Sequence, residues 1–490
     1  MTSITRVRTD ALLSPFGRTP VLSVALATSA VLLAVSPWYG YHRDELYFRL
    51  LGEHPRLGYF DTPPLTPMIA RLSTTVFGDT VVALRIVPAL CAGLVIVLVA
   101  LMTRELGGNR RAQILAAAGT ATASLPLIAG HTLLTLTPDL LLWTATTLCL
   151  MRALLRGEGR YWIWVGLIAG FATYNRDLIV LLLGAIGVGI LAAGPREVLK
   201  DKRLWIGALL AIAVAAPNLV YQVTHDWPQF QMAEALKIDE GTTNRITFVP
   251  LQLLLLGPPQ AVVGVVGWHR LWRDPRTRAL AIAYPVACAV TLYSAGRADY
   301  LVGFLVYLFA AGCVSAAEWR WRRTLVAAFA VTAVVSIVVA LPVVPAASLP
   351  GTPVALANEV SVESVGMYDL ARQVGQVVHG LPEQDRAGAV LLAGNYGEAG
   401  ALDRWAGEFG LPKVYSGHNE LWWWGPPPEG TRVVVAVDFT ARGLGTVFAR
   451  CAQAATVTGM AGEEQDNPIV VCHDPLQPWS QIWPKVRHYN

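Results

Sequence analysis

The feature that most constrains this chain is its series of apolar blocks, each about 20 residues long. A helix needs about 20 apolar residues to cross the hydrocarbon core of a bilayer, which is about 30 Å thick. Of the 490 residues, 54% are hydrophobic and only 15% are charged, whereas a soluble domain has about 25% charged residues. The sequence therefore predicts a polytopic, mostly α-helical membrane protein and excludes an ordinary cytosolic enzyme.

About eleven blocks are predicted to span the membrane, although the fourth to sixth are short. Arg6, Arg8 and Arg18 precede the first block, as in a signal peptide. No small-residue cleavage site follows it, so we interpret this block as a retained signal anchor. The predicted spans are roughly residues 21–37, 80–102, 112–130, 138–153, 161–174, 178–194, 204–222, 247–267, 279–295, 299–317 and 324–343.

Basic residues gather in every second loop between these blocks. Short loops rich in Lys and Arg stay in the cytoplasm. This pattern predicts a plasma-membrane protein with a cytoplasmic N-terminus and an outward-facing first loop, residues 38–79. The net charge of +4 then reflects orientation, and no nucleic-acid partner is predicted. The basic loop residues are Arg104, Arg110, Arg111, Arg152, Arg156, Arg160, Arg196, Lys200, Lys202, Arg203, Arg270, Arg273, Arg276, Arg278, Arg320, Arg322 and Arg323.

The amino-acid pattern of the tail differs from that of the apolar blocks. Its short apolar runs alternate with helix-like stretches, which predicts a small extracytoplasmic α/β domain over residues 346–490, after a membrane domain over residues 1–345. In an oxidising exterior Cys451 and Cys472 could form a disulfide worth about 3 kcal/mol. Two unpaired core thiols are the alternative, and the sequence favours neither.

The first outer loop is dense in functional side chains. Asp44 and Glu45 follow the first predicted span by about seven residues and lie beside Arg43. A carboxylate in a Tyr-rich, apolar surround can be tuned toward general-base catalysis. Tyr59 and Asp61 lie further along this loop. A solvated loop, with its tyrosines in an aromatic interface belt, is the alternative interpretation.

Further charged residues map to the same predicted face of the membrane. Asp139 begins the fourth span, either as a helix cap or as the lining of a polar cavity. Arg176 interrupts the apolar sequence beside Asp177, as half of a structural ion pair or as part of the same cavity. Arg85 and Arg297 lie near the outer ends of other spans. Because an Arg fork binds phosphate bidentately, this group suits a phosphate-bearing membrane lipid.

Other chemistries have little support. The sequence contains no Walker motif, HExxH helix or CxxC pair, so it carries no ATP-driven motor. No cofactor is predicted with certainty. A divalent cation held by His42 or His54 with nearby carboxylates is an open alternative, although the spacing is poor for a metal site.

Several long motifs resemble those of the C-type (GT-C) glycosyltransferases, of the protein O-mannosyltransferase and lipid A aminoarabinose transferase kind (families 39 and 83). They extend over nearly the whole chain, and several are rich in Pro and Trp. The motifs are HRDELYFRLLGEHPRLGYFDTPPLTPMIARL at 42–72, TPDLLLW at 137–143, WVGLIAGFATYNRD at 164–177, GNYGEAGALDRW at 394–405, SGHNELWWWGPPP at 416–428 and CHDPLQPWSQIWPK at 472–485.

The resemblance implies an inverting transferase that moves a sugar from a polyprenyl-phosphate carrier to an extracytoplasmic glycolipid, cell-wall glycan or protein. Asp44 matches the acidic residue assigned as catalytic base, with Glu45 beside it, and Asp139 matches the second acidic position. Arg176 occupies the place of a basic residue near the carrier phosphate. Its neighbours Asn175 and Asp177 depart from the family pattern.

Two alternatives stay open. The same basic cavity would suit a transporter or flippase of lipid-linked sugars that performs no transfer. In the tail, His418 and the aromatic run Trp422–Trp424 either bind sugar rings or the membrane interface, or form a buried hinge that packs the tail onto the outer loops.

Overall fold

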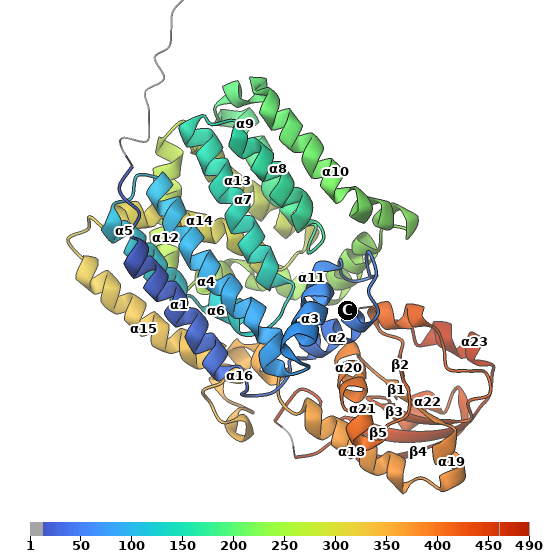
Figure 1. The fold of residues 1–490 in the computed structure, drawn as a ribbon. Coiled ribbons are helices and arrows are strands. Elements are labelled where there is room, and N and C mark those ends of the chain that lie inside the picture. Colours follow the sequence, from blue (N-terminus) through green and yellow to red (C-terminus); the bar gives the residue numbers. More distant parts are fainter. Residues whose placement is uncertain (1–12, 460, 490) are drawn as a thin grey trace, which may run out of the picture.

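The computed structural model describes residues 13–459 and 461–489. The predicted basic residues Arg6 and Arg8 lie outside these residues. A bundle of long helices is followed by a small sheet with short helices around it (Figure 1). The predicted combination of a mostly α-helical membrane part with α/β structure in the tail is thus confirmed at this coarse level.

Six helical segments of the described chain are long and apolar enough to cross a membrane. Two further candidates are pairs of helices that bend sharply, by 61° between α5 and α6 and by 90° between α11 and α12. The six are α1 (Arg18–Val35), α4 (Val81–Glu105), α7 (Leu136–Arg156), α10 (Lys202–Thr224), η3 with α14 (Ala298–Ala316) and α15 (Arg322–Ala340), and the bent pairs are α5 (Arg110–Ala121) with α6 (Ser124–His131) and α11 (Pro228–Leu254) with α12 (Pro258–Arg273).

The predicted number of eleven spans is not confirmed. Three predicted spans are the shorter helices α8 (Arg160–Ala172), α9 (Ile179–Ala193) and α13 (Arg278–Ser294). A helix rises about 1.5 Å per residue, so the 13 residues of α8 cover about 20 Å, less than the hydrocarbon core. Their contacts place these helices in the bundle, since α8 packs on α10, α9 packs on α13, and α13 also packs on α12.

The outer helices of the bundle present large apolar side chains to their surroundings. Leu209 and Val220 on α10, and Val331 and Val334 on α15, are all more than half exposed. Such continuous apolar surface is rare on soluble monomers and is expected where helices face lipid. The chain therefore has the fold of a membrane protein.

The tail contains a five-stranded mixed sheet among the described residues, in the order β2-β1-β3-β5-β4. Strand β1 pairs in parallel with β2 and β3, whereas β5 pairs antiparallel with β3 and β4. The strands are β1 (Ala389–Ala393), β2 (Val414–Ser416), β3 (Val433–Val437), β4 (Phe448–Thr456) and β5 (Pro468–Pro475).

Short helices surround the sheet and connect it to the bundle. Helix α18 is strongly amphipathic in sequence and buries Leu370 and Val374 against the sheet. The helices of this part are α16 (Pro353–Ala357), α17 (Glu359–Val362), α18 (Met367–Gly380), α19 (Glu383–Ala387), α20 (Tyr396–Arg404), α21 (Ala406–Phe409), η5 (Asn419–Trp424), α22 (Ala441–Leu444), α23 (Trp479–Ile482) and η6 (Trp483–Lys485).

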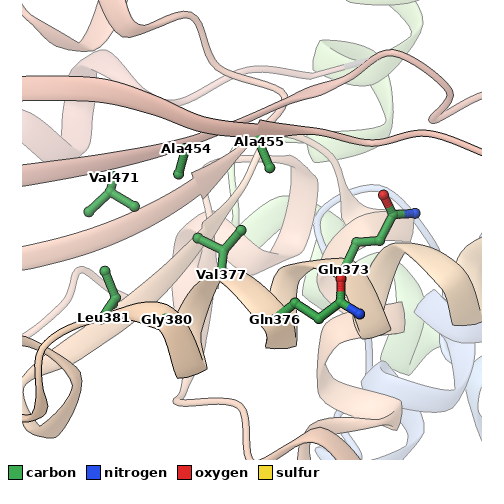
Figure 2. A pocket seen from close by; sticks show the side chains of 8 residues that line it. All are labelled: Gln373, Gln376, Val377, Gly380, Leu381, Ala454, Ala455 and Val471. Atoms are coloured by element: carbon green, nitrogen blue, oxygen red, sulfur yellow. The ribbon is translucent and has the colours of Figure 1, made fainter.

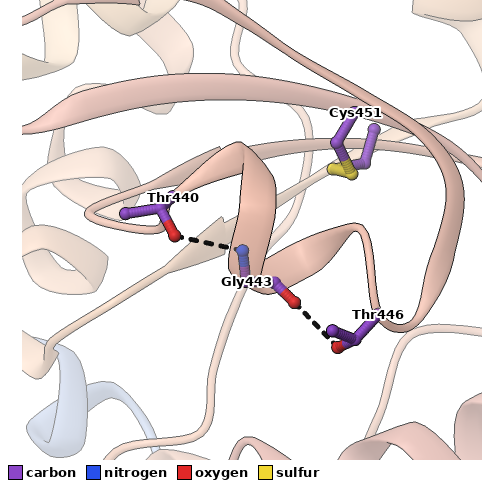
Figure 3. Close-up of a disulfide and its surroundings, with 5 residues drawn as sticks. Thr440, Gly443, Thr446 and Cys451 are labelled. Carbon is purple, nitrogen blue, oxygen red and sulfur yellow. Dashed lines mark hydrogen bonds between the residues drawn. A yellow bond between two sulfur atoms is a disulfide. The ribbon is translucent and has the colours of Figure 1, made fainter.

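A disulfide joins Cys451 and Cys472, which confirms one of the two alternatives left open by the sequence. The two residues face each other directly on the antiparallel strands β4 and β5, with their Cα atoms 4.2 Å apart. The bond lies near α22, where the Gly443 N–H donates to Thr440 Oγ1 (Figure 3). The disulfide therefore links the edge strand of the sheet to its neighbour.

The first outer loop folds into two helices, α2 (Arg43–Glu53) and α3 (Leu65–Phe77). These helices lie between the bundle and the sheet, with α20 beside α2 (Figure 1). Leu46 and Leu51 of α2 belong to the same apolar cluster as Leu391 and Val435 of the sheet. The first loop and the tail thus share a core, and the division of the chain into domains 1–345 and 346–490 stays a prediction.

Candidate active site

Helix α2 begins with a capping box that positions Asp44. The Asp44 N–H donates to His42 Nδ1 at 3.0 Å, and the His42 N–H donates to Glu45 Oε2 at 2.9 Å. Since Nδ1 accepts, Nε2 carries the proton of the ring and donates to Glu363 Oε2 at 2.7 Å. Asp44 therefore lies in the first turn of a helix, where the helix dipole favours a negative charge.

The Asp44 carboxylate is partly buried and has one oxygen oriented by the tail. The Tyr396 hydroxyl donates to Asp44 Oδ1 at 2.9 Å, and no described residue donates to Oδ2. Arg43 donates from Nε to the same Tyr396 oxygen at 3.2 Å and from Nη1 to Glu463 at 2.8 Å. Burial and the Asp44 charge hold the pKa of Tyr396 well above its usual value, so Tyr396 remains a donor.

Glu45, by contrast, is fully enclosed. Arg85 donates to both of its oxygens at 2.9 and 2.8 Å, and the Leu133 N–H donates at 3.1 Å. The remaining Arg85 donors bind Ser36 O, Trp38 O, Gly40 O and His131. Every donor of Arg85 is therefore used inside the protein. The expectation of a phosphate-binding fork at Arg85 does not fit this arrangement, because the same guanidinium serves as the internal partner of Glu45.

Asp61 forms a second carboxyl centre in the loop between α2 and α3. Tyr47 donates to Asp61 Oδ1 at 2.8 Å, and no basic group of the described chain pairs with it. Burial, against the Tyr47 hydrogen bond, raises the pKa of Asp61 to about 7, and the Glu420 charge adds to this. The buried Tyr59 hydroxyl donates to Leu51 O at 3.0 Å, which fixes the path of the loop.

Asp139 lies in the first turn of α7 and is almost fully buried. Among the described residues, its Oδ1 has no hydrogen-bond partner, and neither does Arg176 Nη1 or Trp143 Nε1. Arg176 and Asp299 are the charged groups that act on the Asp139 carboxylate. Since buried polar atoms without partners are rare in native proteins, these groups define a polar centre suited to a polar ligand.

Asn175 connects this polar centre to the first outer loop. Thr66 Oγ1 of α3 donates to Asn175 Oδ1, and Asn175 Nδ2 donates to Thr135 O, both at 2.7 Å. Asp177 accepts from Asn218 at 3.0 Å and forms no ion pair with Arg176 among the described residues. The Arg297 guanidinium is half-exposed and pairs with Asp299 at 3.2 Å.

The predicted aromatic run packs onto the first outer loop. The ring centroids of Trp424 and His54 lie 4.6 Å apart, and Trp423 stacks on Phe60 with ring centroids 5.9 Å apart. His418 is buried against Tyr396, with ring centroids 4.8 Å apart. These contacts support the interpretation of a hinge that holds the tail on the outer loops.

Two cavities lie away from these carboxylates. One, of about 390 Å³, lies between α18 and strands β4 and β5 and is lined by Gln373, Gln376 and small apolar residues (Figure 2). The other, of about 310 Å³, is largely apolar and lies among α11, α12, α13 and α14, beside Trp268 and Tyr284. None of the site residues predicted from the sequence lines either cavity.

A metal site is not evident in the described part of the chain, where no group of three or more His, Cys, Asp or Glu side chains could hold an ion. His42 is engaged by Asp44 and Glu363.

Comparison with known proteins agrees with this architecture. Residues 61–221 match the dolichyl-phosphate-mannose-protein mannosyltransferase family. No curated protein sequence matches the chain. With this match and the fold, the predicted resemblance to the C-type glycosyltransferases is confirmed, and the chain is a membrane glycosyltransferase.

Among solved structures, the chain is similar to ArnT from Cupriavidus metallidurans bound to undecaprenyl phosphate. The TM-score is 0.61 at 15% identity, with 93% of this chain and 98% of ArnT covered. The oligosaccharyltransferase of Archaeoglobus fulgidus, in complex with Zn and sulfate, has a TM-score of 0.50 at 12% identity, covering 85% and 67%. The arabinofuranosyltransferase AftD from Mycobacteria has a TM-score of 0.50 at 15% identity, covering 92% and 40%.

Sequence reasoning missed four residues around the carboxylates. Tyr396 lay within a motif already noted, and the capping box formed by Asn395 and Glu398 marks the helix that it begins. Nothing local indicated which residue of the first loop it would contact. The missed residues are Tyr396, Glu363, Glu420 and Glu463.

Proposed function

We propose that the chain is an inverting glycosyltransferase that moves a sugar from a polyprenyl-phosphate donor to a hydroxyl of an extracytoplasmic acceptor. The acceptor is a glycolipid, a cell-wall glycan or a protein. The observation that carries this proposal is the Asp44 carboxylate. It is partly exposed, Tyr396 holds its Oδ1, and no described residue donates to its Oδ2.

In the proposed reaction, Asp44 Oδ2 accepts the proton of the acceptor hydroxyl as the acceptor oxygen bonds to the anomeric carbon. The bond between that carbon and the carrier phosphate oxygen breaks, and its electron pair leaves with the phosphate. The departing anion needs positive charge rather than a proton. Arg176, whose buried Nη1 has no hydrogen-bond partner in the described part of the chain, supplies that charge, with Arg297 in reserve. Asp139 orients the sugar.

The similarity to ArnT bound to undecaprenyl phosphate supports a polyprenyl carrier. The disulfide supports an oxidising location for the tail. We therefore place the N-terminus in the cytoplasm and both the first loop and residues 346–490 on the outer face of the plasma membrane.

The test is transfer of labelled sugar from the membrane lipid carrier by wild type and by Asp44→Asn at equal expression. Loss of a general base lowers the rate by about 10²- to 10⁴-fold. Asp369→Asn, in an exposed ion pair on α18, serves as the matched control. Undiminished transfer by Asp44→Asn would remove Asp44 from the mechanism, and lipid translocation without any glycosylated product would identify a transporter instead.

A further inference from the structure

We infer that Tyr396, which belongs to the tail, is a positioning residue for Asp44, so that the catalytic carboxylate is completed only when α20 lies on α2. This inference rests on the proposed function, in which Asp44 is the base. It assigns to the tail a direct part in the chemistry, through one hydroxyl group separated from Asp44 by 352 positions in the sequence.

The Tyr396 hydroxyl stands between two opposite charges. It donates to Asp44 Oδ1 at 2.9 Å and accepts from Arg43 Nε at 3.2 Å. Arg43 and Asp44 are adjacent in sequence, yet within the described residues they form no direct ion pair. The hydroxyl thus gives Arg43 an acceptor other than the carboxylate. It also fixes the rotation of the Asp44 side chain, so that Oδ2 is the oxygen left to receive a proton.

The ring of Tyr396 is held on several sides. Its centroid lies 4.7 Å from that of Tyr47 and 4.8 Å from that of His418. The Arg43 guanidinium lies over the ring at 4.6 Å, a cation–π contact. The Tyr396 N–H also donates to His418 Nδ1 at 3.2 Å. Since its neighbours oppose rotation of the ring, the hydroxyl has one direction in which to point.

Two glycines set the distance between α20 and α2. A Cβ atom on Gly397 would lie 2.6 Å from Arg43 Cβ, and one on Gly400 would lie 2.8 Å from the Leu46 carbonyl carbon. No ordinary side chain fits at either position without a shift of the helices. The sequence YGEAG therefore places the tyrosine in the first turn of α20 and keeps one face of that helix bare enough to contact α2.

The experiment uses the full chain with Tyr396→Phe, which removes the hydroxyl and keeps the ring. We expect kcat to fall about 10- to 100-fold, the effect of one hydrogen bond to a charged group, with little change in the acceptor KM. A donated hydrogen bond stabilises a carboxylate, so the acid limb of the pH–rate profile moves to higher pH. Tyr368→Phe is the control, because it removes a similar bond, to Glu408 at 2.6 Å, elsewhere in the tail.

A purely structural role for Tyr396 would lower the thermal unfolding midpoint without moving the pH profile. Gly400→Ala gives a second route, since it keeps the hydroxyl but forces α20 away from Leu46, and we expect the same loss of kcat and the same pH shift. The inference is overturned if either variant, folded, keeps the wild-type kcat and pH profile while Asp44→Asn is inactive. If Asp44→Asn itself retains transfer, the proposed function fails first.

Discussion

Asp44 and Glu45 are neighbours on one helix but have opposite environments. Successive residues of an α-helix point about 100° apart, so one side chain faces the tail and the other faces the bundle. Glu45 accepts hydrogen bonds from Arg85 and two backbone N–H groups. Within the described residues, the Asp44 carboxylate accepts one, from Tyr396. The pair therefore divides into a structural ion-pair partner and a carboxylate with one oxygen available for chemistry.

Glu45→Gln should destabilise the fold rather than only slow a reaction. The substitution leaves the Arg85 guanidinium, fully buried in the protein, without its charge partner, which costs about 3–5 kcal/mol. Chemical unfolding in detergent, followed by tryptophan fluorescence, measures this loss. Asp44→Asn is the comparison and should unfold within about 1 kcal/mol of wild type, because its carboxylate is partly exposed and forms no ion pair in the described chain. Equal stability of Glu45→Gln and wild type would contradict this assignment.

Asp61 should make the stability depend on pH. Its pKa is raised by burial to about 7 in the folded chain, against about 3.9 when unfolded. The stabilisation contributed by the protonated Asp61 carboxyl group is therefore fully present below about pH 4 and is lost as the pH rises through about 7. We expect the free energy of unfolding of Asp61→Asn to depend less on pH than that of wild type over this window. Unfolding midpoints at pH 5 and pH 8 provide the measurement, and parallel curves for the two proteins would contradict it.

Some residues of the candidate site can be proposed from the sequence, and they stay predictions, whereas others depend on tertiary contacts. Asp44 and Asp139 were predicted because acidic residues near the ends of apolar blocks are costly and few. Arg85 was predicted as a phosphate ligand because a sequence shows the charge but not the carbonyl groups that consume its donors. Tyr396 could not be predicted, since its partner is set by tertiary packing of two glycines against a distant helix.

At the scale of elements, the apolar pattern located the helices but not their breaks. The predicted span 247–267 is bent by 90° at Gly257 and Pro258, where Gly257 has a φ of 107°. Such a backbone favours glycine, and the Gly-Pro-Pro sequence could have predicted this break. The predicted span 112–130 bends by 61° around Thr122 and Ala123. Pro126, in the first turn of α6, has no N–H to donate to the Thr122 carbonyl, so the sequence also carries a signal for this break.

A buried pair of carboxyl groups joins α20 to the loop that precedes β5. Glu398 accepts from the Gly394 N–H at 2.8 Å and from Asn467 at 3.2 Å, and Asn467 also donates to Glu464 at 2.6 Å. Burial, with the nearby Glu464 charge, raises the pKa of Glu398 well above its usual value. Glu398 therefore keeps its proton to a higher pH than an ordinary carboxyl group, and we predict that this proton holds the loop on α20.

Loss of that proton as the pH rises should loosen the loop, because a group with a raised carboxyl pKa contributes stability that disappears as the pH rises through that pKa. In Glu398→Gln the amide can donate to Glu464 at any pH. Hydrogen exchange of residues 457–459 and 461–467 should therefore accelerate beyond the intrinsic rate as the pH rises through the raised pKa of Glu398 in wild type, and much less in the variant. Equal protection in both proteins across this range would show that the pair does not hold the loop.

The whole molecule is organised around the contact between the first outer loop and the tail. Sequence reasoning divided the chain at residue 345 because the composition changes there. The packing crosses that boundary, since Leu46 and Leu51 share an apolar cluster with the sheet, and Tyr396 reaches Asp44. Composition records what each segment is made of, whereas a core shared by segments about 350 residues apart appears only in three dimensions. Stability of the sheet and activity at Asp44 should therefore change together.

Removal of the disulfide tests whether activity at Asp44 depends on the stability of the sheet. Removing it by Cys451→Ser with Cys472→Ser frees a segment of 21 residues, which costs the sheet about 3 kcal/mol. Because β5 pairs with β3, and the sheet supports α20, we expect transfer activity to be lost at a lower temperature in the variant, with an unchanged rate at low temperature. Activity measured against temperature, beside unfolding of the same samples, gives the comparison. Cys313→Ala, at a free thiol inside α14, is the control for loss of a cysteine outside the sheet. Loss of the disulfide without any change in the temperature at which activity disappears would show that α20 stays on α2 independently of the sheet.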